Sequence, residues 1–288
     1  MKQFCVLLSM LLFISCNKKI VVERTTYFPK QTEMMTGKID KQNVWVFILA
    51  GQSNMAGRGI VEPQDTVANK RILSINKNGQ LIKAKEPLHF YEPNLAGLDC
   101  GYSFGKAMIK NIADGISILL IPTAVGGSSI SQWLGDSLFR NVKLLSNFIN
   151  KVEIGKQYGT IKGILWHQGE SDANEKSIPF YHERLSKLFT KFRFAVGNVN
   201  LPVLSGELGY FSKDKVHFNL INKAIHSYLL QDLNAAVISA AGLKDKGDSL
   251  HFNSKGQRIM GKRFADAYLQ IFLKNLINFK IKKHDKRK

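Results

Sequence analysis

Three side chains from distant parts of the chain carry the groups that acyl transfer to a serine requires. Ser53 supplies a hydroxyl, His251 an imidazole and Asp248 a carboxylate. In this chemistry the hydroxyl attacks a carbonyl carbon, the imidazole takes its proton, and the carboxylate orients the imidazole and stabilises its protonated form. The three-residue spacing lets Asp248 reach one ring nitrogen of His251 while the other nitrogen faces Ser53. We therefore predict a catalytic group of Ser53, His251 and Asp248.

The same chemistry needs hydrogen-bond donors for the negative charge that develops on the carbonyl oxygen. Candidate donors are the backbone N–H groups of Ser53 and Gly127 and the side-chain amide of Gln168. Glycine allows a close approach of backbone to substrate, and an amide donates without carrying charge. Each candidate also has a structural alternative. Ser53 would cap a helix, Gly127 would belong to a strand-ending turn, and Gln168 would be a surface amide.

Five short apolar runs predict the strands that must position these groups. The first run is entirely apolar and is followed by Gly51, which permits a tight turn before Ser53. Apolar runs bounded by turn residues fit strands that are buried in a parallel sheet. The carboxyl ends of such strands meet at one edge, where the candidate residues would converge. The runs cover residues 44–50, 116–121, 161–166, 202–205 and 235–240.

Helical patterns alternate with these strands, and Ser254 is expected to cap the last helix. This alternation predicts an α/β fold with a five-stranded parallel sheet covered by helices on both faces. We assign one domain, residues 41–274. Residues 60–99 are irregular, with a short hairpin expected near residues 71–75, and are predicted to form a substrate-facing rim. The helices are expected at residues 102–111, 141–152, 178–194, 218–230 and 254–273.

The N-terminus has the pattern of a targeting segment. Lys2 precedes a mostly apolar run, residues 6–14, that is too short to span a bilayer comfortably. The run resembles a bacterial lipoprotein signal, which would comprise residues 1–15 and leave a lipid on Cys16. The alternatives are an ordinary secretory signal and an uncleaved anchor. Polar residues 16–40 are predicted to be a tether, and the protein is expected in a bacterial cell envelope, at its periplasmic or outer surface.

Composition and charge limit the other classes of function. The chain is 44% hydrophobic and 22% charged, which is typical of a globular protein. Of its three cysteines, only Cys100 lies beyond the signal and the lipidation site, so no disulfide within the chain is expected, and no cysteine–histidine spacing indicates a metal. The formal net charge is +19, and residues 275–288 form a basic tail. That tail would contact an anionic polymer or membrane, or would be a solvated surface. No nucleic-acid motif accompanies the charge, so no nucleic-acid partner is expected.

Four sequence blocks together resemble a known family. GQSNMAGRG, GGSS, WHQGESD and DSLHFNSKGQ occur in this order at residues 51–59, 126–129, 166–172 and 248–257. They match the motif blocks of SGNH/GDSL-type esterases, and most closely those of acetylxylan esterases and sialate O-acetylesterases, the SASA family. The resemblance implies a three-layer αβα sandwich with a flavodoxin-like sheet. It also implies deacetylation of carbohydrate without a metal or other cofactor, and the roles given above to the five candidate residues.

Glu170, in the third block, has two interpretations. By resemblance, the acid at this position assists or replaces Asp248 as the partner of His251. The alternative is that Glu170 organises its loop through backbone hydrogen bonds. The expected function is a serine esterase that removes O-acetyl groups from acetylxylan or a related polysaccharide. The alternatives are a sialate O-acetylesterase, a lipase-like or thioesterase-like SGNH hydrolase, and a catalytically silent glycan-binding lipoprotein.

Overall fold

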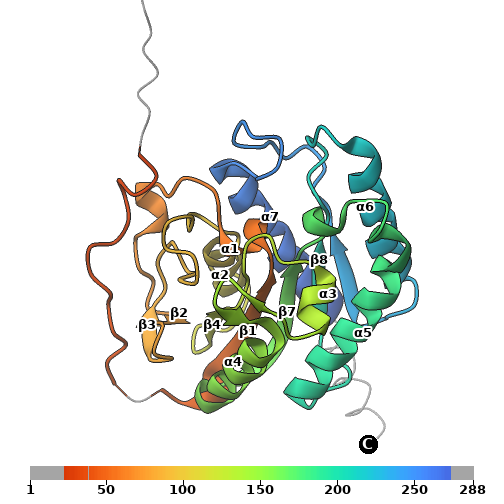
Figure 1. The fold of residues 1–288 in the computed structure, drawn as a ribbon. Coiled ribbons are helices and arrows are strands. Elements are labelled where there is room, and N and C mark those ends of the chain that lie inside the picture. The colour runs from red at the N-terminus through yellow and green to blue at the C-terminus, as the bar shows by residue number, and fades with distance from the viewer. Residues whose placement is uncertain (1–22, 38, 274–288) are drawn as a thin grey trace, which may run out of the picture.

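A computed structural model describes residues 23–37 and 39–273, which form a central sheet between two layers of helices (Figure 1). The expected signal peptide, Cys16 and the basic tail lie outside the described residues. None of the helices in the described part of the chain is both long enough and apolar enough to cross a membrane.

All five predicted strands are present, and they are parallel. Their order across the sheet is β4-β1-β7-β8-β9, which places the first strand between the second and the third. This is the flavodoxin-like order that the resemblance implied, and its switch point lies beside the first strand. The strands are β1 (Val44–Gly51), β4 (Ser117–Pro122), β7 (Thr160–His167), β8 (Val203–Gly206) and β9 (Ala235–Ile238).

The predicted count of five strands needs correction, because the sheet has seven. The hairpin expected near residues 71–75 consists of β2 (Ile72–Ile75) and β3 (Leu81–Lys83). Strand β2 pairs with β4 in parallel, and β3 pairs with β2 in the antiparallel direction and forms the edge. All four residues of β2 are buried, so this part of the irregular segment belongs to the core as well as to the rim.

Part of the predicted tether also belongs to the domain. The Met35 N–H donates to Leu81 O over 3.0 Å, and the Lys83 N–H donates to Glu33 O over 2.9 Å. These bonds place residues 33–35 against the outer side of β3, where they cover an edge that would otherwise leave its backbone groups unpaired. The segment is therefore fixed to the sheet before the chain enters β1.

The two faces of the sheet are covered by different helices. Along β1, Val46 and Ile48 pack into one hydrophobic cluster while Phe47 and Leu49 pack into the other, which is the two-residue period of a strand buried on both sides. Helices α2 (Gly101–Ile109) and α7 (Ser254–Ala267) contribute to the cluster around Phe47. The opposite cluster holds α3 (Ile130–Leu134), α4 (Leu144–Tyr158), α5 (Ile178–Val196) and α6 (Lys215–Leu229). The three-layer αβα architecture is confirmed.

The short elements lie near the rim and the ends. They are the one-turn helix α1 (Ser53–Ala56), the hairpin β5 (Leu138–Phe139) and β6 (Val142–Lys143), and the 3₁₀ turns Lys41–Asn43, Pro63–Asp65 and Glu170–Asp172. A π-helical turn, Tyr268–Leu273, follows α7. The predicted cap of α7 was one residue late. Asn253 Oδ1 accepts the Gly256 N–H over 2.8 Å, while the hydroxyl of Ser254 donates to Ile60 O.

Candidate active site

A pocket of about 350 Å³ opens beyond the carboxyl ends of β1 and β7. The predicted residues Ser53, Gly127, Glu170 and His251 all line it, although they come from four separate loops. The position agrees with the rule that open parallel sheets bind ligands at the switch point of the strand order. The convergence that the strand pattern predicted is therefore present.

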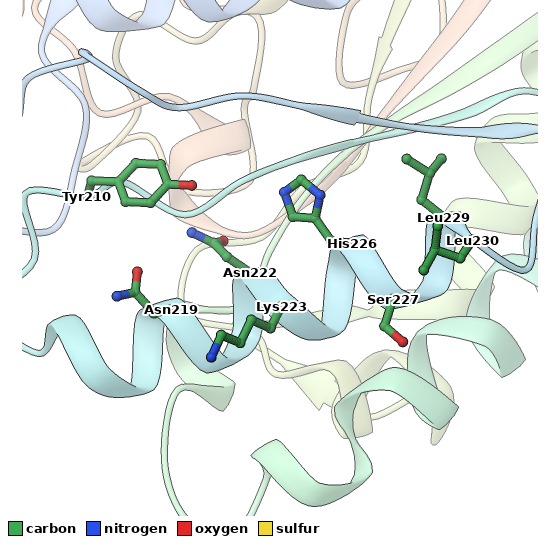
Figure 2. A pocket seen from close by; sticks show the side chains of 8 residues that line it. All are labelled: Tyr210, Asn219, Asn222, Lys223, His226, Ser227, Leu229 and Leu230. Carbon is green, nitrogen blue, oxygen red and sulfur yellow. The ribbon is translucent and has the colours of Figure 1, made fainter.

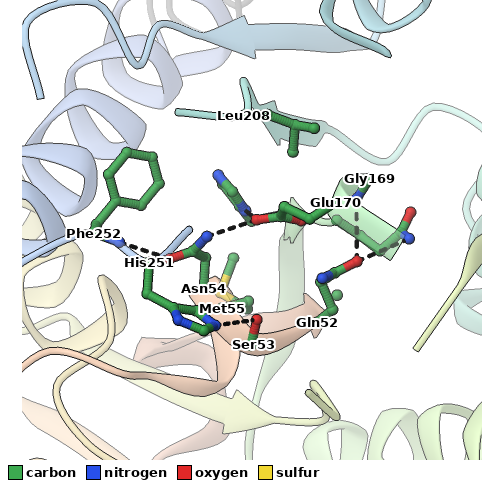
Figure 3. A network of polar contacts seen from close by, with 12 residues as sticks. Gln52, Ser53, Asn54, Met55, Gly169, Glu170, Leu208, His251 and Phe252 are labelled. Atoms are coloured by element: carbon green, nitrogen blue, oxygen red, sulfur yellow. Dashed lines mark hydrogen bonds and ion pairs between the residues drawn. The ribbon is translucent and has the colours of Figure 1, made fainter. Parts of the chain in front are cut away.

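Ser53, His251 and Asp248 form a continuous hydrogen-bonded chain. The Ser53 Oγ atom lies 2.9 Å from His251 Nε2 (Figure 3). On the other side of the ring, His251 Nδ1 lies 2.7 Å from Asp248 Oδ2. Ser53 is 7% exposed. This arrangement places a hydroxyl, a base and an orienting carboxylate in the order that nucleophilic catalysis requires.

The turn before Ser53 needs glycine at position 51. Gly51 has a φ of 138°, and a Cβ atom there would lie 2.1 Å from His167 O, the last carbonyl of β7. The turn brings Ser53 to the first position of α1, where the backbone N–H has no partner within the helix. That N–H is available to a substrate oxygen.

The carboxylate of Asp248 is held in its ionised form by its own loop. Partial burial alone would raise the pKa of Asp248. Hydrogen bonds from the His251 backbone N–H, the His251 ring and the Leu250 N–H outweigh this effect, and the net result is a pKa lowered to about 2. The side chain of Asp248 therefore stays charged across the ordinary range of pH.

Gln168 is not where the predicted donor should be. It is fully buried beneath the pocket, and its Nε2 atom lies 2.6 Å from Asp172 Oδ2 and 3.1 Å from both Gln52 Oε1 and Ser128 O. An amide nitrogen has two hydrogens, so these acceptors already occupy its donors. The side chain at position 168 turns inward after β7, which corrects its predicted place in the pocket.

The amide that lines the pocket is that of Gln52. Its Oε1 atom accepts from Gln168 Nε2 at 3.1 Å, from the Ser171 N–H at 3.2 Å and from the Gly169 N–H at 3.4 Å. Because the oxygen faces these donors, the Nε2 atom of Gln52 lies on the side toward Ser53 (Figure 3). Gln52 is adjacent to the predicted nucleophile in the first motif block, yet the sequence did not reveal this orientation.

A buried ion cluster supports the glycine loop beside the pocket. Both carboxylate oxygens of Glu92 lie 3.0 Å from Arg58 Nη2, and Oε2 also accepts the Gly126 N–H over 2.6 Å. Arg140 pairs with the same carboxylate, and it reaches the pocket from the tip of the β5–β6 hairpin. Gly127 follows with a φ of 82°, a left-handed conformation that favours glycine. Sequence reasoning missed Glu92 because it lies in the irregular segment.

Glu170 reaches the pocket without contacting the imidazole of His251. Its side chain is 3% exposed, and Oε1 accepts a hydrogen bond of 2.6 Å from Asn54 Nδ2. His167 Nδ1 lies 3.8 Å from the same oxygen. Within residues 23–37 and 39–273, no bond joins Glu170 to His251, so the structure does not bring the acid to the ring.

A second groove lies over α6 and lacks the arrangement of a hydrolase (Figure 2). Tyr210 and His226 line it, and the buried carboxylate of Glu207 holds both, at 2.9 Å and 2.6 Å. Among the described residues no serine or threonine hydroxyl contacts His226, so this histidine–carboxylate pair has no nucleophile. The described residues also include no cluster of three or more His, Cys, Asp or Glu side chains that could hold a metal ion.

Comparison with known proteins places these features in a family. A family model described as carbohydrate esterase, sialic acid-specific acetylesterase, matches residues 43–270. A probable carbohydrate esterase of Arabidopsis thaliana is 30% identical over 250 residues, which cover 79% of this chain and 91% of the relative. Its crystal structure superposes with a TM-score of 0.71 at 28% identity, covering 80% of this chain and 99% of that one.

Two other solved structures share the fold at lower identity. NanS has a TM-score of 0.67 at 16% identity, with 82% of this chain and 100% of that chain covered. A carbohydrate acetylesterase from Xanthomonas citri has a TM-score of 0.59 at 22% identity, with 80% and 56% covered. The match to the family model, the Arabidopsis relative and the geometry of the pocket agree with the resemblance of the motif blocks. This chain belongs to the SASA family of SGNH-type carbohydrate esterases and is a carboxylic ester hydrolase.

Proposed function

We propose that this protein removes O-acetyl groups from carbohydrate through an acetyl-serine intermediate on Ser53. The observation that carries the proposal is the 2.9 Å contact between Ser53 Oγ and His251 Nε2 inside a pocket at the sheet edge. The bond of 2.7 Å from His251 to Asp248 supports the same assignment, because it leaves Nε2 free to accept the hydroxyl proton.

The mechanism follows from these contacts. As Ser53 Oγ bonds to the acetyl carbonyl carbon, its proton passes to His251 Nε2, and the carbonyl oxygen becomes an oxyanion. The carbon–oxygen bond to the sugar then breaks, and the sugar oxygen takes the proton from His251. A water molecule then gives a proton to His251 as its oxygen bonds to the acetyl carbon. The bond from that carbon to Ser53 Oγ breaks, Oγ takes the proton back from His251, and acetate leaves.

The oxyanion donors in this proposal are two backbone groups and one side chain. Ser53 and Gly127 provide N–H groups at the pocket, and the amide of Gln52 replaces that of Gln168 as the third donor. Gln168 then orients Gln52, because the Nε2 atom of Gln168 donates to the Gln52 oxygen and fixes its direction. Asp172, which accepts from Gln168 over 2.6 Å, extends this support into the core.

Changing Gln52 to glutamate should lower kcat by about 10²- to 10³-fold with little change in KM. The glutamate has the same size and keeps oxygens for the Gly169 and Ser171 N–H groups, but it presents an acceptor to the oxyanion instead of a donor. Steady-state kinetics with a nitrophenyl acetate measure the change. If the variant kept the parent kcat, Gln52 would not be an oxyanion donor.

The favoured substrate is acetylxylan or a related acetylated polysaccharide, and the alternative is an O-acetylated sialic acid. The description of the matching family supports the alternative. Arg140 supports it as well, because its side chain is 43% exposed at the pocket and its guanidinium would pair with a sugar carboxylate.

The two substrates can be separated by acetate release from acetylated xylan and from O-acetyl sialic acid, with Ser53→Ala as the blank for both. We expect faster release from acetylated xylan, as kcat/KM per acetyl group. Arg140→Gln removes a partner of Glu92 under the glycine loop, so it should lower the rates on both substrates, and by the same factor if neither substrate pairs with Arg140. Faster release from sialic acid, reduced more strongly in Arg140→Gln than release from xylan, would establish the alternative. Chain-length preference on nitrophenyl esters separates both from a lipase-like enzyme.

The cell-envelope location and the lipid on Cys16 are part of the same proposal. They are supported by the apolar run of residues 6–14 and by the small residue before Cys16. The mass of the mature N-terminus tests both.

A further inference from the structure

Asn54, the residue after the nucleophile, holds the backbone on both sides of His251. Its Oδ1 atom accepts the Phe252 N–H over 3.0 Å (Figure 3). Its Nδ2 atom donates to Leu250 O over 3.1 Å. Asn54 is 2% exposed, so water does not compete for these bonds. A single amide therefore fixes the residue before the base and the residue after it.

These bonds connect the nucleophile to the base by a short route. Ser53 and Asn54 are neighbours on the one-turn helix α1, whose position is set by β1. The backbone carbonyl of Asn54 also accepts Gln257 Nε2 over 2.9 Å, which fastens this turn to α7. The loop that carries His251 is thus placed by the turn that carries Ser53, although 198 positions separate the two residues.

Glu170 fixes the direction of the Asn54 amide. The second hydrogen on Asn54 Nδ2 goes to Glu170 Oε1 over 2.6 Å, and the side chain of Glu170 is 3% exposed. A hydrogen bond to a buried carboxylate is stronger than one between neutral groups. It favours the orientation in which nitrogen faces Leu250 and oxygen faces the Phe252 N–H. The flipped amide would place its one oxygen against the oxygens of Glu170 and Leu250, and its NH₂ group against the Phe252 N–H.

We infer that Asn54 is a positioning residue for His251 and that Glu170 acts on the base through Asn54. The inference rests on the proposed roles of Ser53 and His251. It assigns Glu170 neither of the roles considered from the sequence alone, because the acid does not contact the imidazole and its bond is to a side chain. We call the bonds of Asn54 to Leu250, Phe252 and Glu170 the Asn54 clamp. The bond between His251 and Asp248 is separate from this clamp.

The first test is Asn54→Ala, with Asn222→Ala as a matched control. Asn222 is another buried amide that holds backbone, since its Oδ1 accepts the Leu208 N–H over 2.8 Å and its Nδ2 donates to Leu208 O over 3.2 Å. Both variants should lower Tm. Only Asn54→Ala should lower kcat, by about 10²-fold with KM nearly unchanged, because a base displaced by about 1 Å transfers its proton poorly.

The second test compares Glu170→Gln with Glu170→Ala. Glutamine keeps an oxygen for Asn54 Nδ2, so kcat should stay within about fivefold of the parent, whereas alanine should lose at least about tenfold. In the Asn54→Ala background, neither substitution at position 170 should reduce kcat further, because the group through which Glu170 acts is gone. If Asn54→Ala does not fold, the comparison of the single variants Glu170→Gln and Glu170→Ala still tests the inference.

The opposite results would overturn the inference. They are parent-like kcat in Asn54→Ala, equal losses in Glu170→Gln and Glu170→Ala, or additive losses in the double variants. Equal losses would assign Glu170 a direct role of its carboxylate in catalysis. Ser53→Ala, assayed in parallel, tests the proposed function separately from the positioning role of Asn54. If it is active, the proposed function fails, and if it is inactive while Asn54→Ala is normal, only the clamp fails.

Discussion

Replacing Ser53 by alanine is expected to reduce kcat for nitrophenyl acetate by on the order of 10⁴- to 10⁶-fold. In the proposed mechanism the hydroxyl of Ser53 bonds to the acetyl carbon, and this hydroxyl lies 2.9 Å from His251 Nε2. The initial burst of product should disappear together with the steady rate. Stopped-flow measurement of nitrophenolate release gives both quantities in one experiment.

Covalent labelling provides the control for this variant. A fluorophosphonate should attach to the parent enzyme at Ser53, and the labelled peptide should be identified by mass spectrometry. Ser171→Ala is a matched control, because its hydroxyl also belongs to a residue that lines the pocket but donates to Gly127 O over 3.0 Å. Labelling of Ser53→Ala, or full loss of labelling in Ser171→Ala, would contradict the assignment of the nucleophile.

The strands and the contacts within the proposed triad were predictable because most of their signals are local. Seven consecutive apolar residues before Gly51 predict β1, and the glycine allows the turn that exposes Ser53. Asp248 and His251 are three residues apart, so their contact within one loop follows from short-range geometry. The meeting of this loop with Ser53 was predictable because parallel strands bring their carboxyl ends to one edge.

Which of the two amides faces the pocket was not predictable, because it depends on the direction in which two side chains point. Gln52 and Gln168 both follow strands, and both have the chemistry of a donor. The structure separates them through Asp172, whose buried carboxylate draws the amide of Gln168 away from the pocket. Such a contact between loops depends on side-chain packing, about which strand periodicity carries no information.

The supports of the site were missed for a similar reason. Glu92 and Asn54 each hold a catalytic loop through bonds between distant segments, and Glu92 lies in a stretch without periodicity. Strand β2 was underestimated because its four residues, three of them apolar, give too short a signal to distinguish a rim hairpin from a strand of the main sheet. In both cases the sequence does not show which distant segment of the chain lies against the residue or strand.

Replacing Asp248 by asparagine is expected to lower kcat by about 10³- to 10⁴-fold while leaving the fold intact. The carboxylate accepts the proton on His251 Nδ1, which leaves Nε2 able to accept from Ser53. An asparagine that turns its NH₂ group toward Nδ1 makes this atom an acceptor and moves the ring proton to Nε2. The base is then in the tautomer that cannot take the serine proton.

The pH dependence of the two enzymes distinguishes this effect from a general loss of structure. The pKa of Asp248 is lowered from 3.8 to about 2, so its stabilising contribution is complete above pH 3.8 and is lost only as the pH falls toward 2. Loss of activity between pH 4 and 7 in the parent is therefore not the titration of this carboxyl. The loss of kcat in Asp248→Asn should therefore be present throughout pH 4 to 7, while circular dichroism shows the parent fold over the same range.

Asp245→Asn is the matched control for Asp248→Asn. Asp245 lies in the same loop, and its Oδ2 atom accepts the Gly247 N–H over 3.0 Å and the Ser249 N–H over 2.6 Å, so it also holds backbone without touching His251. This variant should retain kcat within about tenfold. A loss in Asp245→Asn as large as that in Asp248→Asn would mean that loop order, rather than the carboxylate on His251, accounts for the effect. Parent-like kcat in Asp248→Asn would remove Asp248 from the proposed triad.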